Sequence, residues 1–363
     1  MKKTRNHTIL LKKAINGERL NTQEGVKILE EADLLALGQT ANLVRQRLHP
    51  QKTVTFTIDR NINYTNVCWC QCRFCAFWRE LNDKDAYVID KKELVQKIKE
   101  TIVAGGTSLL LQGGLHPHLG LDYYLDLLKF IKENFNIHLH SFSPPEIIHL
   151  ARKEGLSVQK VLVALRKAGL DTLPGGGAEI LVDRVRKQIS PRKITAGEWL
   201  ETMRQAHALG MKTTATMMFG HVETLAERVL HLMKIRELQD ETGGFTAFIP
   251  WTYQSPAGRN QQAPVAKMGT SVDYLRTLAL ARLMLDNIPH LQVSWVTQGI
   301  KVAQVALFFG ADDFGSTMLE ENVVRAAGAT VSRISPAEII HFIQKAGFKP
   351  AQRTVTYEII KIF

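Results

Sequence analysis

Residues 66–75 read Asn-Val-Cys-Trp-Cys-Gln-Cys-Arg-Phe-Cys and contain all four cysteines of this 363-residue chain. Cys68, Cys72 and Cys75 have the spacing Cys-x-x-x-Cys-x-x-Cys, with an aromatic residue before the last cysteine. Cysteines confined to one short segment cannot form a disulfide framework, which closes loops throughout a chain. Three thiolates on one loop can instead hold three irons of a 4Fe-4S cluster and leave the fourth iron without a protein ligand.

The same segment allows a zinc site made by all four cysteines. Such sites usually draw their ligands in pairs from two separated knuckles, which this segment does not offer. A zinc-stabilised nucleic-acid-binding protein would also account for the net charge of +11. Because the basic residues are dispersed and few aromatic residues lie between them, we expect no nucleic-acid partner. Cys70 is interpreted as a bystander, and a role as an alternative ligand is left open.

The rest of the sequence predicts where the protein works. No segment approaches the roughly 18 apolar residues of a membrane span. At the amino terminus, Ile9, Leu10 and Leu11 form an apolar run too short for a signal peptide. We therefore expect no membrane partner and a cytoplasmic location, where clustered thiols remain reduced.

Strand-like runs alternate with amphipathic helical stretches along the chain. Helices are predicted to begin at caps such as Asp90, Ser157 and Thr195, and one ends at Gly169. Eight strands alternating with helices indicate an α/β protein with a (β/α)8 TIM-type barrel, and an open doubly wound sheet is the competing architecture. The predicted strands cover residues 54–59, 108–111, 137–141, 170–173, 213–218, 245–249, 291–296 and 311–314.

Three parts of the chain are expected. Residues 1–50 form a helical segment packed on the barrel, residues 51–330 form the barrel, and residues 331–363 add a helix and strand extension. The cysteines follow the first predicted strand, and glycine-rich or polar segments follow most of the others. Since active sites of such barrels form at the carboxyl ends of the strands, these segments are predicted to meet at one mouth.

The cysteine spacing after a first barrel strand resembles the signature of the radical S-adenosylmethionine (SAM) superfamily. The resemblance implies a 4Fe-4S cluster held by Cys68, Cys72 and Cys75, with SAM as cosubstrate on the open iron. It implies that reduction cleaves SAM to methionine and a 5'-deoxyadenosyl radical. The cofactor contacts that it implies are Gly113, Gly114, Ser143, Glu179 and Arg184.

A closer resemblance is to the cyclic dehypoxanthine futalosine synthase family of menaquinone biosynthesis. The matching stretches are residues 63–68, 113–117, 138–146, 173–179, 213–223, 239–254, 294–299 and 315–324. The sister families of aminofutalosine synthase and the deazaflavin FO synthase subunits share much of this pattern. The glycine run 175–177 and the stretch Ile-Pro-Trp-Thr-Tyr-Gln at 249–254 favour the cyclase, while Cys70 and Trp78 depart from its usual pattern.

The family resemblance implies an intramolecular carbon–carbon bond formation. The radical takes hydrogen from the 4' carbon of the substrate's sugar, the sugar radical adds to the benzoate ring, and an electron and a proton are then lost. The final step needs a base, and the candidates in predicted mouth segments are His116, His140, Glu146 and Asp313. Flavodoxin or ferredoxin is the expected electron donor, and the exterior helices leave room for a homodimer.

Overall fold

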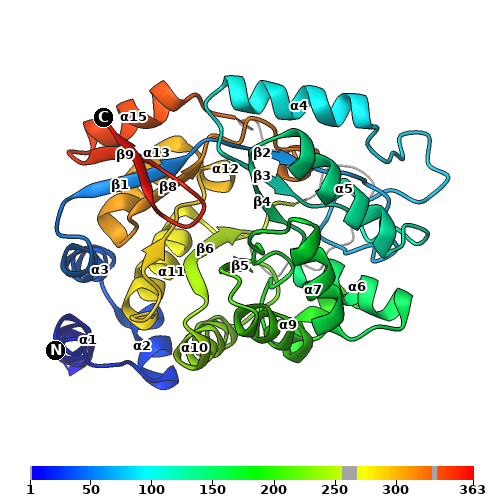
Figure 1. Ribbon diagram of the computed structural model, residues 1–363. Helices are drawn as coiled ribbons and strands as arrows, with labels where there is room; N and C mark the ends of the chain where they lie inside the picture. Colours follow the sequence, from blue (N-terminus) through cyan, green and yellow to red (C-terminus); the bar gives the residue numbers. More distant parts are fainter. Residues whose placement is uncertain (1, 256–267, 329–332) are drawn as a thin grey trace.

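The structure is a computed structural model, and it describes residues 2–255, 268–328 and 333–363. Strands form a ring in the interior, and helices surround it (Figure 1). The strands are β1 (Thr53–Thr57), β2 (Asp59–Ile62), β3 (Ser108–Leu111), β4 (His138–Ser141), β5 (Thr213–Phe219), β6 (Phe245–Thr252), β7 (His290–Leu291), β8 (Asp313–Ser316), β9 (Lys349–Arg353) and β10 (Ile359–Ile362).

Neighbouring strands pair in the order of a closed barrel. In parallel, β2 pairs with β3, β3 with β4, β5 with β6, and β6 with β7. Isolated bridges at Thr172 and Leu173 join β4 to β5, and a bridge from Gln292 to Asp313 joins the β7 edge to β8. β1 pairs with β8 and closes the ring. The predicted TIM-type barrel is confirmed, and the open sheet is not found.

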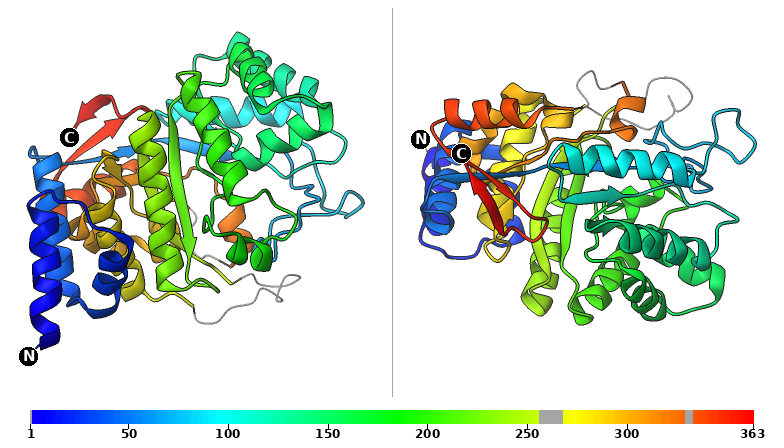
Figure 2. Two further views of the ribbon diagram at one scale, coloured as in Figure 1. Left: turned by 90° about the horizontal axis from the view of Figure 1, so that it is seen from below. Right: turned by 45° about the horizontal axis from the view of Figure 1, so that its top comes forward.

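The helices lie outside this ring, as Figure 2 shows in two further views. Asp90, Ser157 and Thr195 cap α4, α7 and α9 as predicted, and Gly169 ends α7 in the left-handed conformation. The helices are α1 (Lys2–Ile15), α2 (Thr22–Glu31), α3 (Leu34–Leu48), α4 (Lys91–Val103), α5 (Leu121–Asn134), α6 (Pro144–Glu154), α7 (Val158–Ala168), α8 (Asp183–Ile189), α9 (Ala196–Ala208), α10 (Leu225–Thr242), α11 (Ser271–Met284), α12 (Trp295–Gln298), α13 (Ile300–Ala306), the short 3-10 helix η1 (Leu307–Phe309), α14 (Val323–Ala326) and α15 (Pro336–Lys345).

Two predicted strands differ in extent from the prediction. The first, predicted over 54–59, is divided at Ile58 into β1 and β2, which face different neighbours. The fourth, predicted over 170–173, retains only the two bridge residues. Both are corrections of extent, and neither removes a position from the barrel.

The seventh predicted strand, residues 291–296, is wrong beyond its first residues. β7 ends at Leu291, and Ser294 precedes the short helix α12. The alternation of Val293 and Trp295 indicated a strand. Trp295 is buried instead within a helical turn, where its indole Nε1 donates to the Ser316 carbonyl at 2.8 Å.

The N-terminal helices pack on the outside of the barrel. α3 packs against α11 and η1, and α2 packs against α10. Leu37 and Ala41 of α3 are fully buried in the same core as the strands. Arg45 is also buried, and its guanidinium lies 4.8 Å from the ring centre of Phe348. The first three helices therefore share one hydrophobic core with the barrel and the C-terminal segment.

The C-terminal segment extends the sheet beside β1 and lines the barrel cavity. β9 pairs in parallel with β1, and β10 pairs antiparallel with β9. Arg353 reaches Asp313 through Nε at 2.5 Å and Nη2 at 3.0 Å. Its guanidinium lies 3.9 Å from the centre of the Tyr357 ring, which stacks on His290 at 3.6 Å. The expected boundary between residues 330 and 331 lies outside the described residues.

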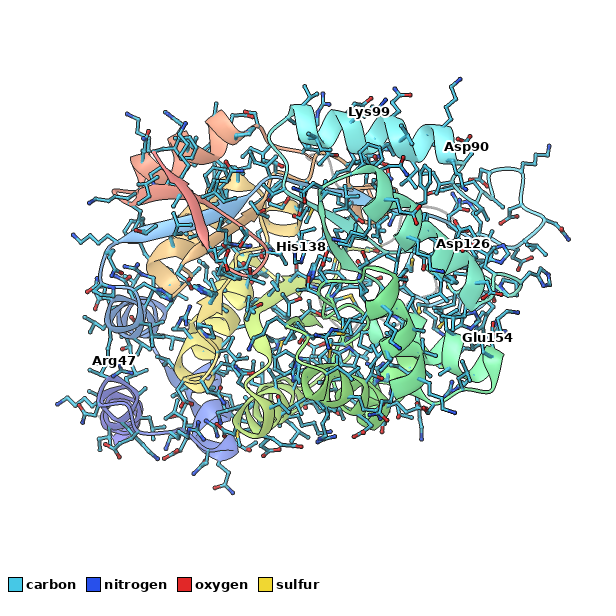
Figure 3. All side chains as sticks on the ribbon, in the orientation of Figure 1. Arg47, Asp90, Lys99, Asp126, His138 and Glu154 are labelled. Carbon is cyan, nitrogen blue, oxygen red and sulfur yellow. The ribbon has the colours of Figure 1, made fainter. Side chains whose placement is uncertain are left out.

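Charged side chains lie mainly on the outside of the molecule. Figure 3 shows Arg47, Lys99 and Glu154 at the periphery and His138 of β4 near the centre. Among the described residues, no helix combines the length and the apolar character needed to cross a membrane.

We expect Arg353→Met to destabilise the protein, because it leaves the Asp313 carboxylate buried without its cation. The two side chains are 5% and 0% exposed. Breaking a buried pair of this kind costs about 3–5 kcal/mol. The free energy of unfolding in urea, followed by circular dichroism, measures this cost.

Arg204→Met is the matched control for this variant. Arg204 pairs with Glu241 at 2.6 Å but is 40% exposed. Loss of an exposed pair costs less than about 1 kcal/mol. Equal losses for the two variants would show that the C-terminal segment does not contribute to the stability of the barrel.

Candidate functional site

The cysteine loop, residues 63–80, follows β2 at the carboxyl end of the barrel and is tied to two other segments. The Trp69 backbone N–H donates to the Leu115 carbonyl after β3 at 3.1 Å, and the Arg73 N–H donates to the Ile189 carbonyl at the end of α8 at 2.9 Å. These bonds fix the loop across the mouth. The thiols therefore have a defined position relative to the neighbouring strands.

A cavity of about 250 Å³, the mouth cavity, lies against this loop. All four cysteines line it, with the aromatic side chains Phe74, Phe77, Trp78 and Trp251. Its other walls include Gln112, Gly113, Gly114, Ser143, Glu146, Gly176, Gly177 and Lys193. The structure thus brings the three predicted cluster ligands together with Gly113, Gly114 and Ser143, three of the five predicted SAM contacts.

The ammonium group of Lys193 lies near the cysteine thiols. Lys193 Nζ lies 2.8 Å from Glu179 Oε1 and 5.1 Å from the centre of the Phe74 ring. The hydrogen bond from Cys70, whose sulfur is 3.6 Å away, and the Lys193 ammonium lower the pKa of Cys72 to about 7. Burial raises the pKa of Cys75 to about 12. Since iron binds thiolates, Cys72 is the thiol best prepared to receive it, and a metal would deprotonate the others.

Glu179 is buried, and one of its carboxylate oxygens receives no hydrogen bond from the described residues. Its Oε1 receives Lys193, whereas Oε2 accepts no hydrogen bond within the described part of the chain, although Arg186 Nη1 is 3.5 Å away. Its backbone has a φ of 41°, which a non-glycine residue rarely adopts. A buried acceptor without a donor costs free energy, and a ligand hydroxyl would relieve that cost.

Two glycines are required by close packing beneath the loop. A Cβ atom on Gly114 would lie 2.2 Å from the Val67 carbonyl oxygen. A Cβ atom on Gly177, where φ is +79°, would lie 2.4 Å from the Pro145 ring. The segments after the second and fourth strands therefore approach the site with bare backbone, which leaves the cavity wall open to a ligand.

Glu146 acts as the hydrogen-bond centre of the mouth. The Tyr64 hydroxyl donates to Oε1 and the Ser143 hydroxyl to Oε2, while the Gly113 N–H donates to Oε1 at 3.2 Å. Burial raises the pKa of Glu146 to about 7. Both oxygens are occupied, so this carboxyl positions Gly113 and Ser143.

A second cavity of about 320 Å³, the barrel cavity, lies inside the ring of strands. Asp59, His140, Glu179 and Arg353 line it. It shares the residues Gln112, Gly176, Gly177, Trp251 and Val323 with the mouth cavity. A molecule at the mouth and a second molecule inside the barrel would therefore meet at a common wall.

The barrel cavity contains two titratable side chains, His140 and Asp59, whose pKa values burial shifts in opposite directions. His140 Nδ1 lies 2.7 Å from the Thr172 hydroxyl, and burial lowers the pKa of the ring to about 3. The imidazole is neutral at pH 7, with Nε2 not used by Thr172. Burial raises the pKa of Asp59 to about 6, and the Ser316 hydroxyl donates to its Oδ1.

Known proteins resemble the chain along its whole length. Residues 62–235 match the model of the Radical SAM superfamily, and residues 242–363 match the CofH/MqnC C-terminal region. A cyclic dehypoxanthine futalosine synthase of Halalkalibacterium halodurans is 48% identical over 98% of this chain and 95% of the relative. The chain belongs to the cyclic dehypoxanthine futalosine synthase family of radical SAM enzymes.

One sister enzyme and one solved structure place this family assignment in context. An aminodeoxyfutalosine synthase of Thermus thermophilus is 40% identical over 98% of this chain and 96% of the relative. The crystal structure of HydG, a maturase of the [FeFe]-hydrogenase, has a TM-score of 0.77 at 16% identity, covering 97% of this chain and 77% of that chain. This last likeness shows the shared fold.

Radical SAM enzymes use a 4Fe-4S cluster and SAM, and the residues of this member fit both. The three thiols with the family spacing line one cavity, its aromatic walls exclude water, and the adjacent glycines leave room for a ligand backbone. Cys68, Cys72 and Cys75 would hold the cluster. Glu179 lines the barrel cavity, and its Oε2, which accepts no hydrogen bond among the described residues, suits a hydroxyl donor of a bound ligand.

Arg184 does not lie where the sequence predicted it. The sequence predicted a cofactor contact, but the structure places Arg184 on the surface, where it pairs with Glu227 through Nε at 2.6 Å and Nη2 at 2.5 Å. The arginine that faces the site is Arg186, which donates to the carbonyls of Gly177 and Ala178 and so holds the glycine turn. Both arginines lie on α8, and only Arg186 lies on its inner face.

Two of the four candidate bases also have other roles. His116 is buried outside both cavities, and its Nδ1 accepts the backbone N–H groups of His118 and Leu119. Asp313 is saturated by Arg353, the Gly315 N–H and the Thr55 hydroxyl. Neither group is placed to receive a proton from a ligand, because each already serves the fold.

Sequence reasoning missed Lys193, Arg186 and Asp59. Lys193 lies beyond the end of α8, and no spacing connected it with the cysteines. Arg186 could have been separated from Arg184 by its helical spacing from the buried Val185 and Ile189. Asp59 was the last residue of a predicted strand, a position that faces the mouth in a barrel, so this signal was available.

Cys72→Ala is expected to remove the cluster and leave the fold intact, because the loop lies at the mouth and not in the main core. Iron and acid-labile sulfide after anaerobic reconstitution measure cluster loading, and circular dichroism measures folding. Cys70→Ala is the matched control, and it should load iron as the parent does. Loss of the cluster in the control would make Cys70 a ligand, and unfolding of Cys72→Ala would make the site structural.

Proposed function

We propose that this chain converts dehypoxanthine futalosine into cyclic dehypoxanthine futalosine, a step of menaquinone biosynthesis. The observation that carries the proposal is the common wall of the two cavities, with thiols on one side and an enclosed barrel interior on the other. A reaction inside one molecule needs one closed site that holds the sugar and the benzoate ring together. The higher identity to the cyclase than to the sister enzyme supports this substrate.

When bound, the cluster and SAM supply a carbon radical that removes a hydrogen atom from the substrate. Cys68, Cys72 and Cys75 hold the cluster at the mouth. Gly113, Gly114 and Ser143, positioned through Glu146, offer backbone and hydroxyl groups to the methionine part of SAM. Glu179 accepts from a ribose hydroxyl through Oε2, while its Oε1 binds Lys193.

The barrel cavity holds the substrate away from water and from stray hydrogen donors. Trp251 and Val323 belong to the wall that separates it from the mouth cavity, and Arg353 and Tyr357 belong to its lining from the C-terminal segment. A radical on the sugar therefore meets the tethered ring before solvent. The side-chain amide of Gln112, which lines both cavities, can bond a hydroxyl at the reacting end.

Asp59 accepts the last proton in this proposal. It lines the barrel cavity, has one hydroxyl donor on Oδ1, and has a pKa near neutrality because it is buried. A base of this kind is charged at pH 7 and still takes a proton readily. His140, the candidate that the sequence already gave, lines the same cavity and is the alternative acceptor.

The remaining assignments follow from the chemistry of the site. The electron donor is a low-potential flavodoxin or ferredoxin, and the net charge of +11 suits an acidic partner of this kind. Arg73 of the cysteine loop and Arg192, which contacts this loop, are exposed where such a partner would dock. The proposal includes a cytoplasmic location, where thiols stay reduced, and no nucleic-acid or membrane partner.

The reconstituted protein with reductant, SAM and dehypoxanthine futalosine should form 5'-deoxyadenosine and a product two hydrogens lighter than the substrate. Mass spectrometry of the reaction measures both. A panel with the sister substrates, a 3-carboxyvinyloxy-benzoate and the pair of L-tyrosine with 5-amino-6-(D-ribitylamino)uracil, is the control. Deoxyadenosine without the cyclic product would reject the substrate and retain the radical class.

Asp59→Asn should lower the yield of cyclic product per deoxyadenosine, because hydrogen abstraction continues while the last proton is not taken. General bases contribute on the order of 100-fold or more. In the parent, the same yield should fall as the pH drops through about 6, where Asp59 becomes protonated. His140→Gln is the matched variant, and a pH-independent parent yield with loss only in His140→Gln would transfer the role to His140.

A further inference from the structure

Cys70 is the one thiol of the mouth cavity that the proposed function does not use. Its side chain is 1% exposed, and its sulfur lies 3.6 Å from the sulfur of Cys72, a proposed cluster ligand. Both residues belong to the same small apolar cluster as Leu115. The contact is made inside the protein, so it is independent of any partner.

The backbone of the loop holds this pair together. Gln71, between the two cysteines, has a φ of 48°, so the chain turns sharply and both side chains face the same cavity. Arg192 fixes the turn from outside, since its Nη1 donates to the Gln71 side-chain oxygen at 2.8 Å and to the Trp69 carbonyl at 3.2 Å. A turn held at both ends keeps the two sulfurs close in the absence of a metal.

We propose that Cys70 is a resolving thiol that converts oxidised Cys72 into a reversible Cys70–Cys72 disulfide in the cluster-free protein. The oxidant is a peroxide small enough to enter the mouth cavity. This inference rests on the proposed role of Cys72 as a cluster ligand. It assigns Cys70 a function at the same site and leaves the chemistry of the loaded enzyme unchanged.

The reaction balances in two steps. The Cys72 sulfur attacks one oxygen of hydrogen peroxide, the O–O bond breaks, and the sulfur becomes a sulfenic acid while the other oxygen leaves as water. The Cys70 sulfur then attacks the sulfenic sulfur, and the S–S bond forms as a second water leaves with the remaining thiol proton. Two thiols are oxidised by two electrons in all, and one peroxide is reduced.

The consequence is protection of a ligand that the enzyme cannot replace. Without a resolving thiol, a sulfenic acid is open to further oxidation to sulfinic acid, which thiols do not reduce. As a disulfide, Cys72 cannot bind iron, but a dithiol restores it. Cluster loading would thus stop under oxidation and resume on reduction.

The experiment uses cluster-free full-length protein treated with hydrogen peroxide and then alkylated. Peptide mass spectrometry should find Cys70 and Cys72 joined, two hydrogens lighter than the dithiol. After dithiothreitol and anaerobic reconstitution, the parent should regain its iron. Cys70→Ser should lose recovery by about tenfold or more, with oxygen atoms added to Cys72. Untreated Cys70→Ser should load iron normally.

Cys68→Ser is the matched control, because it removes another thiol of the cavity and keeps the pair. It should still form the Cys70–Cys72 disulfide, although it cannot hold the cluster. A disulfide from Cys72 to Cys68 or Cys75 in the parent, or full recovery of Cys70→Ser, would overturn the proposal. Failure of untreated Cys70→Ser to load would also overturn it, by making Cys70 a ligand. None of these measurements depends on the substrate.

Discussion

The strand pairing of residues Thr53 to Ile62 is the constraint on which both ends of the barrel depend. Its first half, β1, closes the ring against β8 and receives β9 of the C-terminal segment on its other edge. Its second half, β2, pairs with β3 and then leads into the cysteine loop. The division at Ile58 lets one strand position serve two sets of neighbours. One continuous segment therefore fixes the position of the Arg353–Asp313 pair, here called the floor pair, and of the thiols at the mouth.

Two buried ion pairs, Lys193–Glu179 and Arg353–Asp313, lie near this segment. At the mouth, Lys193 pairs with Glu179, and its charge acts after the hydrogen bond from Cys70 as a further cause of the lowered pKa of Cys72. In the floor pair, the Arg353 guanidinium neutralises the Asp313 carboxylate. The barrel cavity also contains Asp59, whose pKa burial raises to about 6, and His140, whose pKa burial lowers to about 3, so Asp59 is the one of these two groups that changes protonation near pH 7. The interior thus separates fixed charges from exchangeable ones.

The sequence predicted the parts of this arrangement that depend on local pattern. The helix caps, the ring of eight strand positions and the joint position of Cys68, Cys72 and Cys75 follow from spacing and alternation. It could not separate Arg184 from Arg186, because the choice depends on which face of α8 meets the glycine turn. It gave Asp313 a chemical role, since the partner that saturates it, Arg353, lies far along the chain. Tertiary pairing decides these cases, and one sequence does not show it.

The C-terminal segment also influences the proposed proton acceptor through β8. Asp313 and Ser316 are the two ends of this strand, and they are opposite Thr55 and Thr57 of β1. Arg353 pairs with the Asp313 carboxylate, and the Ser316 hydroxyl at the other end of the strand donates to Asp59. Burial is the largest cause of the raised pKa of Asp59; the Ser316 hydrogen bond and the charge of Arg353 lower this pKa, and the charge of Asp313 raises it. If the floor pair were lost, Asp59 would meet an uncompensated charge or a missing one, and its protonation at pH 7 would shift. A segment that stabilises the barrel from outside its mouth is therefore also part of the electrostatics of the reaction.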